Sequence, residues 1–181
     1  MVYVFLADGF EEIEALTPVD LLRRAGVEAK TVSIYPDRRD VKGARDICVV
    51  ADITIDDANI GKDDMIVLPG GMPGTVNLLE CEKLMEMVES HNEKEGRIAA
   101  ICAAPARILG SKGLLNGKEA TCYPGLEDLM DKATPVIKTV VTDGNITTSR
   151  GLGTAVDFAC ELITLLCGKQ KSDEIRSSVV A

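Results

Sequence analysis

Residues 99–110 read AAICAAPARILG, an apolar run that stops at a cysteine and continues through two alanines and a proline. A strand often ends at such a break, and proline is favoured near the first turn of a helix. The stretch therefore predicts a strand over 97–101, a sharp turn at Cys102 and a helix through Leu109. Whether the thiol at this turn is used chemically depends on the rest of the chain.

The alternation of apolar strand and helix extends to both sides of this stretch. Strands that are apolar throughout and alternate with helices indicate a parallel sheet covered on both faces, so we expect an α/β fold. No repeat or linker divides the chain, and residues 1–181 are predicted to form a single domain. The expected strands are 2–7, 29–34, 65–71 and 97–101, with a smaller strand pair in 44–56 and a hairpin in 139–149; the expected helices are 12–25, 77–89 and 154–169, with a last short helix near the C-terminal end.

The charge and hydropathy of the chain disfavour several classes of partner. The formal net charge is −9, and an acidic surface repels nucleic acid and anionic lipid. No apolar run approaches the roughly 20 residues that cross a bilayer. A secretory signal has a basic region before its apolar stretch, and the first residues of this chain have none. We therefore expect a cytoplasmic protein with neither a nucleic-acid scaffold nor a membrane as partner.

The cysteines and the single histidine do not form a metal-binding pattern. No C-x-x-C pair occurs, so neither a metal nor a cofactor is expected, and the thiols are predicted to be mostly free and buried. His91 is expected on the surface, at the far end of strand 97–101 from Cys102, which disfavours a Cys-His hydrolase. The six cysteines are Cys48, Cys81, Cys102, Cys122, Cys160 and Cys167.

Three loops are predicted at the carboxyl ends of the strands, where ligands of such folds bind: ADGFEE (7–12), PGGMPG (69–74) and the turn at Cys102. A thiol at a helix N-terminus is favoured as the thiolate, although an inert thiol capping a core strand fits as well. The amides of Gly70, Gly71 and Ala103 are suited to binding a developing oxyanion. A simple connecting turn is the alternative; no G-K-[ST] follows, which disfavours a phosphate loop.

An acidic cluster opens the predicted first helix. Glu11, Glu12 and Glu14 all suit a helix N-terminus through the helix dipole. With Ile13 and Leu16 predicted to face inward, Glu14 lies near the buried edge and the carboxyl end of the sheet. A carboxyl group there is expected to stay protonated, hydrogen-bond the cysteine sulfur and later move a proton.

Four motifs in this order resemble the ThiJ/PfpI superfamily, closest to the branch of the parkinsonism-associated protein deglycase and the bacterial protein YajL. They are ADGFEEIEALTPVDLLRRAG (7–26), IVLPGGMPG (66–74), AAICAAP (99–105) and TTSRGLGTAVDF (147–158). The resemblance extends from Val2 to about Gly168. It implies a flavodoxin-like three-layer α/β/α sandwich with a mostly parallel sheet and a nucleophile elbow, assembled as a homodimer.

The resemblance also implies roles for single residues. Cys102 matches the reactive cysteine of the family and Glu14 its partner acid, while Gly71 and Ala103 match the backbone oxyanion site. Arg24 and Arg45 match arginines that the family places near the dimer interface and the pocket.

Three positions depart from patterns within the superfamily. Ala103 stands where the protease-like branch has a histidine, so peptidase activity is not expected. Tyr123 stands where the deglycase branch often has a pocket histidine, which suggests a YajL-like subtype. Leu152 replaces a proline that many relatives have in the R-G-P-G turn, so this wall of the pocket is expected to differ.

The implied activity is that of a cofactor-free glyoxalase or deglycase. The Cys102 thiolate would add to glyoxal, methylglyoxal or early glycation adducts of amines, with Glu14 as the proton shuttle. The alternative is a non-enzymatic oxidative-stress sensor and chaperone in which Cys102 oxidises to sulfinic acid. A third reading is a role in thiazole-phosphate (thiamine) biosynthesis, for which the sequence offers no phosphate-binding motif.

Overall fold

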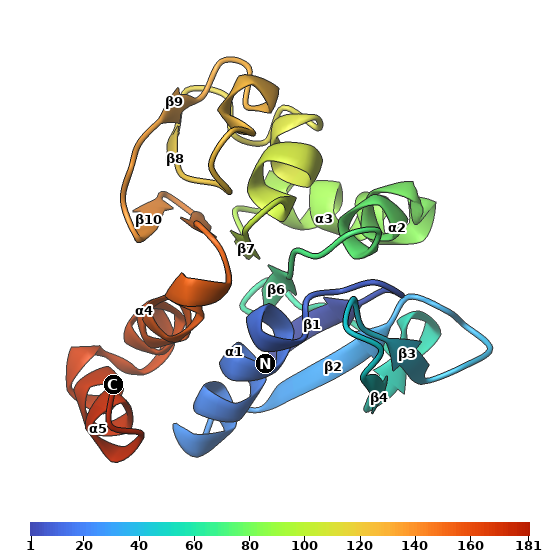
Figure 1. Ribbon diagram of the computed structural model, residues 1–181, viewed down its shortest axis with the longest axis horizontal. Helices are drawn as coiled ribbons and strands as arrows, with labels where there is room; N and C mark the ends of the chain where they lie inside the picture. Colours follow the sequence, from blue (N-terminus) through green and yellow to red (C-terminus); the bar gives the residue numbers. More distant parts are fainter.

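The chain, seen in a computed structural model that describes residues 1–181, is built around a sheet of seven strands (Figure 1). All neighbouring strands are parallel except the antiparallel pair β10–β11. The predicted mostly parallel sheet is confirmed. In spatial order the strands are β10 (Val140–Asp143), β11 (Ile146–Ser149), β7 (Arg97–Ile101), β6 (Met65–Leu68), β1 (Val2–Leu6), β2 (Ala29–Ser33) and β5 (Ile53–Thr54).

Helices cover both faces of the sheet, which confirms the flavodoxin-like three-layer arrangement. Alternate residues of β1 enter two separate cores: Val4 and Leu6 pack with one helical layer, and Tyr3 and Phe5 with the other. The first layer holds α1 (Glu12–Arg24), α4 (Ala155–Cys167) and α5 (Lys169–Ser178); the second holds α2 (Gly74–Glu80), α3 (Glu82–Glu93) and the π-helical segment η2 (Pro105–Gly110). No helix has the length and apolar character needed to cross a membrane.

Shorter elements connect these layers. The strand pair predicted within 44–56 is instead β3 (Asp40–Lys42) with β4 (Cys48–Val50), because β5 joins the main sheet beside β2. The helix predicted over 77–89 is two helices, which meet at Cys81. The remaining short elements are β8 (Glu119–Ala120), β9 (Thr134–Pro135), η1 (Ile55–Asp57), η3 (Glu127–Leu129) and η4 (Leu152–Thr154).

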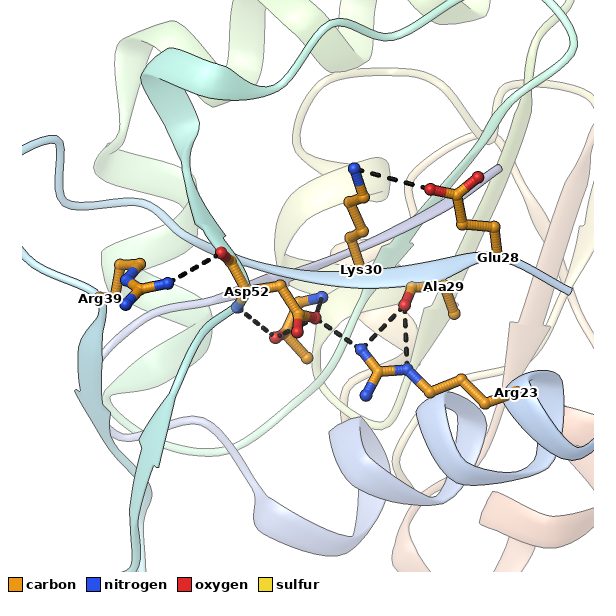
Figure 2. Close-up of polar contacts among 7 residues, drawn as sticks. Arg23, Glu28, Ala29, Lys30, Arg39 and Asp52 are labelled. Atoms are coloured by element: carbon orange, nitrogen blue, oxygen red, sulfur yellow. Dashed lines mark hydrogen bonds and ion pairs between the residues drawn. The ribbon is translucent and has the colours of Figure 1, made fainter.

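A polar network anchored on Asp52 fastens β5 to β2 and α1 (Figure 2). The Asp52 carboxylate accepts hydrogen bonds from the backbone N–H of Thr31 at 2.8 Å and from its hydroxyl at 2.9 Å. Arg23 donates to the same carboxylate and to the carbonyl of Ala29. Burial opposes ionisation of Asp52, but the donors from Thr31 and the charge of Arg23 prevail and lower its pKa.

Two predictions about exposure are wrong. Ile13 is 48% exposed and not inward, while Glu12 and Glu14 on the same helix are buried. His91 is buried and not on the surface, because Gly96 leaves room for its ring, which a Cβ there would approach to 2.2 Å. Its Nε2 lies 3.1 Å from the carbonyl oxygen of Asp64, and burial lowers its pKa. His91 nevertheless lies at the opposite end of β7 from Cys102, as predicted.

The six cysteines are free thiols in three kinds of environment. Cys122 and Cys160 are buried, as expected for small apolar side chains, and Cys81 and Cys102 are half-buried. Cys48 and Cys167 are exposed, so burial does not extend to all of the thiols.

Candidate active site

Cys102 occupies a sharp turn directly after β7. Its φ is +66°, in the left-handed region that residues with a side chain rarely adopt. Two backbone hydrogen bonds hold this conformation: the Cys102 amide donates to the carbonyl of Ser149 at 3.0 Å, and the Tyr123 amide donates to the carbonyl of Cys102 at 2.8 Å. The backbone strain is therefore stabilised from β11 and from the loop after β8, which matches the geometry of a nucleophile elbow.

The carboxyl group of Glu14 reaches the sulfur from α1, which follows β1, two strands from β7 in the sheet. The Glu11 carboxylate caps α1 by accepting the amide N–H of Glu14 at 2.8 Å. The Glu14 side chain is only 1% exposed; its Oε2 accepts the amide N–H of Gly70 at 3.0 Å, and the thiol of Cys102 donates to its carboxylate. The predicted Glu14–Cys102 contact is therefore present in the structure.

Gly70 packs directly against both groups. A Cβ at this position would lie 2.5 Å from Oε2 of Glu14 and 2.7 Å from Cβ of Cys102. No side chain fits there without displacing the acid or the thiol. The Gly70 amide serves Glu14, whereas the sequence placed it at the oxyanion position.

Burial and mutual contact shift the pKa values of the pair. Burial raises the pKa of Glu14 to about 7, opposed by the hydrogen bond from Cys102. Burial, the charge of Glu14 and the hydrogen bond to it raise the pKa of the Cys102 thiol to about 12. The sequence favours a thiolate at a helix N-terminus, with an inert thiol as the alternative. In the structure, burial of the sulfur and the adjacent Glu14 carboxylate disfavour the thiolate.

Two backbone amides oppose the rise in the thiol pKa. The N–H groups of Ala103 and Gly71 lie within hydrogen-bonding reach of the Cys102 sulfur and lower its pKa. Donors placed there would also face the oxygen of a carbonyl group bound beside the sulfur. Gly71 adopts a φ of +95°, and a Cβ there would lie 2.3 Å from the amide nitrogen of Glu11, so the turn requires glycine.

A cavity of about 460 Å³ opens onto the sulfur. Its size suits a small molecule, and most of its lining is apolar. A larger hollow of about 630 Å³ borders the opposite end of β7 and contains none of the predicted site residues. The cavity at the sulfur is lined by Glu11, Glu14, Ala44, Arg45, Gly71, Met72, Cys102, Ala103, Arg107, Tyr123, Leu126 and Leu152.

The structure gathers most of the predicted residues but separates one. Arg45 and Tyr123 line the cavity with Cys102, and the Arg45 amide donates to Oε1 of buried Glu12 at 2.6 Å. Arg24 lies elsewhere: it pairs with Asp20 at 2.8 Å on the exposed face of α1. Within one chain, Arg24 therefore does not border the pocket.

Sequence reasoning missed four residues of the lining, Ala44, Met72, Arg107 and Leu126. Arg107 had a readable signal, because it is the only charged residue in AAICAAPARILG. Its amide donates to the carbonyl of Ala103 at 2.9 Å, one turn beyond the elbow. Met72 and Leu126 carry no comparable signal, since apolar loop residues are common.

The sequence of the chain also matches the profile of a known protein family over most of its length. The profile described as the DJ-1/PfpI family matches residues 1–165. The chain belongs to the DJ-1/PfpI family. The ThiJ/PfpI resemblance predicted from the four motifs is thereby confirmed.

Individual DJ-1/PfpI relatives match nearly the whole chain. Protein DJ-1 homolog B of Arabidopsis thaliana is 41% identical over 181 residues, covering 99% of this chain but 41% of the relative, so the chain spans less than half of that protein. Glutathione-independent glyoxalase DJR-1.2 of Caenorhabditis elegans is 30% identical, covering 91% of this chain and 87% of the relative. The solved structure described as "Toxoplasma gondii DJ-1, oxidized" has a TM-score of 0.93 at 35% identity, covering 99% of this chain and 97% of that one.

Proposed function

We propose that this DJ-1/PfpI protein is a cofactor-independent enzyme that converts small oxoaldehydes, such as methylglyoxal, into hydroxy acids. The observation that supports the proposal is a buried acid with a pKa of about 7 in contact with a thiol at the elbow of a small cavity. An acid with a pKa near the working pH is suited to moving protons in both directions. The name of the C. elegans relative favours the same chemistry.

The first step would form the carbon–sulfur bond. The Cys102 thiol transfers its proton to the Glu14 carboxylate as the sulfur attacks the aldehyde carbon. The amides of Gly71 and Ala103 stabilise the aldehyde oxygen, which then takes the proton back from Glu14 to complete a hemithioacetal and leaves Glu14 deprotonated. Negative charge thus moves from the carboxylate through the sulfur to the substrate oxygen while no net charge enters the buried site.

The second step is an internal oxidation and reduction. Deprotonated Glu14 removes the proton from the former aldehyde carbon and returns it to the neighbouring carbonyl carbon, while the hydroxyl proton of the hemithioacetal passes to the oxygen of that carbonyl. The first carbon is thereby oxidised to a thioester and the second is reduced to an alcohol. Water then hydrolyses the thioester, which releases the hydroxy acid and restores the thiol. The overall reaction adds one water to the oxoaldehyde, and it requires no external oxidant or reductant.

The same hemithioacetal would form from early glycation adducts of amines: the sulfur would bond to the carbon that the amine has captured, the carbon–nitrogen bond would break, and the amine would leave with the thiol proton passed on by Glu14. The small cavity and its half-buried sulfur favour free oxoaldehydes and short adducts over large ones.

The decisive experiment measures lactate formed from methylglyoxal without glutathione. Wild type is expected to form lactate, and Cys102→Ser is expected to lose at least a hundredfold in rate, since serine is a far weaker nucleophile at neutral pH. Cys48→Ser, which alters an exposed thiol outside the cavity, serves as the matched control. Equal rates for wild type and Cys102→Ser would end this proposal.

Sensing of peroxide is the second function that a specific observation favours, because the Toxoplasma DJ-1 structure is described as oxidized. The Cys102 thiolate would reduce two molecules of hydrogen peroxide to water and become a sulfinate. Intact-mass analysis during a peroxide titration is expected to show two added oxygen atoms in wild type and none at this site in Cys102→Ala. Oxidation that proceeds equally in Cys102→Ala would contradict the sensor function.

We also propose a cytoplasmic homodimer. Exposed apolar side chains flank the site: Ile13 on α1, Ile47 and Val50 at the β3–β4 hairpin, and Leu152 at the cavity. A second copy would remove them from water. Light scattering is expected to give twice the chain mass of 19.4 kDa, whereas a monomer at micromolar concentration would refute the assembly.

A further inference from the structure

The lining of the Cys102 cavity carries positive charge that a neutral oxoaldehyde does not use. Arg107 and Arg45 both line the cavity, and neither forms a salt bridge within the chain. The guanidinium of Arg45 donates only to the adjacent carbonyl of Ala44, while the guanidinium of Arg107 has no hydrogen-bond partner. In a chain of net charge −9, two unpaired arginines beside one cavity indicate a site for an anion.

The acids of the same cavity are already engaged. The Glu11 carboxylate accepts the amide N–H of Glu14, and Glu14 accepts the amide N–H of Gly70 and faces the sulfur. Both acids thus serve the elbow and the start of α1. The donors of Arg107 remain available to a ligand in the cavity.

We propose that Arg107 is a specificity-determining residue that binds a carboxylate on the substrate, so that the preferred class is small oxoaldehydes with a carboxylate at the far end. This inference rests on the proposed function. Arg107 lies one turn beyond Ala103 and lines the same cavity as Cys102, so a substrate whose aldehyde is at the sulfur can extend toward its side chain. A guanidinium and a carboxylate form two parallel charge-assisted hydrogen bonds, which lysine cannot reproduce.

The test compares two substrates that undergo the same chemistry: methylglyoxal, which is neutral, and 4,5-dioxopentanoate, which carries a terminal carboxylate and yields 2-hydroxyglutarate. Wild type is expected to show at least a tenfold higher kcat/KM for dioxopentanoate. In Arg107→Leu this ratio is expected to fall about tenfold, as for one lost charge-assisted pair in a partly exposed site, and Arg107→Lys should retain part of it. Arg39→Leu removes an exposed arginine that only touches the Asp52 carbonyl (Figure 2) and should leave the ratio as in wild type.

Binding to a non-reacting variant separates this inference from the proposed function. Calorimetric titration of Cys102→Ser with 2-hydroxyglutarate and with lactate is expected to favour 2-hydroxyglutarate, and adding Arg107→Leu should abolish the preference. If neither oxoaldehyde is turned over but this preference is found, the glyoxalase proposal fails and the carboxylate site stands. If methylglyoxal is turned over but Arg107→Leu leaves the ratio of kcat/KM values unchanged, the role of Arg107 is overturned. The same holds if the two acids bind equally to Cys102→Ser.

Discussion

Replacing Glu14 with glutamine removes the group that sets the pH behaviour of the site. Glu14 is 1% exposed, and burial raises its pKa from 4.5 to about 7. In the unfolded chain the carboxyl group titrates near its ordinary value. At a pH between these two pKa values, the Glu14 carboxyl group must therefore take up a proton when the chain folds. The stability that the protonated carboxyl contributes is fully present below pH 4.5 and is lost as the pH rises through about 7.

The magnitude follows from the difference between the two pKa values, about 2.5. At 1.36 kcal/mol for each pKa unit, the loss amounts to about 3 kcal/mol. Urea unfolding of wild type and Glu14→Gln, followed by circular dichroism from pH 4 to 8, measures the free energy of unfolding. The free energy of unfolding of wild type minus that of Glu14→Gln should fall by about 3 kcal/mol as the pH rises from 4 to 8. The pKa of Cys102 is about 12, so ionisation of the thiol does not enter the window.

Glu80→Gln, which removes an exposed carboxylate at the end of α2, controls for a simple loss of charge. A difference between wild type and Glu14→Gln that stays constant with pH would refute the reasoning. It would mean that Glu14 ionises in the folded protein as easily as in the unfolded chain. The acid would then be unable to hold a proton near neutral pH.

Two further outcomes are expected. In Gly70→Ala the new Cβ would lie 2.5 Å from the Glu14 carboxylate, so lactate formation should fall at least tenfold and the free energy of unfolding by about 1–3 kcal/mol. Gly153→Ala is the control, because a Cβ at that position meets no atom within 4 Å. Normal turnover in Gly70→Ala would contradict the packing. Asp52→Ala should destabilise by about 1–3 kcal/mol at pH 7, because the Thr31 amide loses its acceptor, and the difference should shrink as the pH falls through the lowered pKa of Asp52. Urea unfolding at pH 3 and pH 7 checks this, and a pH-independent difference would count against it.

The sequence was sufficient to place Cys102 and Glu14 together because topology decides their positions. Cys102 follows β7 and Glu14 opens the helix after β1, two strands away in the same parallel sheet, and the carboxyl ends of parallel strands meet at one edge. The exposure of α1 could not be predicted in the same way. Ile13 faces outward since Glu12 and Glu14 turn inward, and each of these acids is accommodated by a backbone amide distant in sequence, from Arg45 and Gly70. Local hydrophobic spacing contains no information about such distant donors.

The positions of Arg24 and Arg107 show a similar limit. The motif predicts Arg24 near the dimer interface and the pocket, yet within one chain it pairs with Asp20 on the outer face of α1. Arg107 lies just outside the matching motif, yet it lines the cavity. A motif records what the members of a family share. The isolated charge of Arg107 in an apolar stretch is readable in the sequence, but its place in the lining is visible only in the structure.

The raised pKa of the thiol and a reactive sulfur are compatible because Glu14 and Cys102 share one negative charge. Burial and the charge of ionised Glu14 keep the proton on the sulfur; once the proton has moved to Glu14, its charge no longer opposes the thiolate, and the amides of Ala103 and Gly71 offset part of the cost of burial. The supply of thiolate therefore follows the ionisation of the pair near pH 7, not that of the isolated thiol. The two proposed functions, addition to a carbonyl and reaction with peroxide, would both draw on this thiolate. Under these proposals peroxide and carbonyl would compete for one sulfur, and each oxidised molecule would be lost to catalysis.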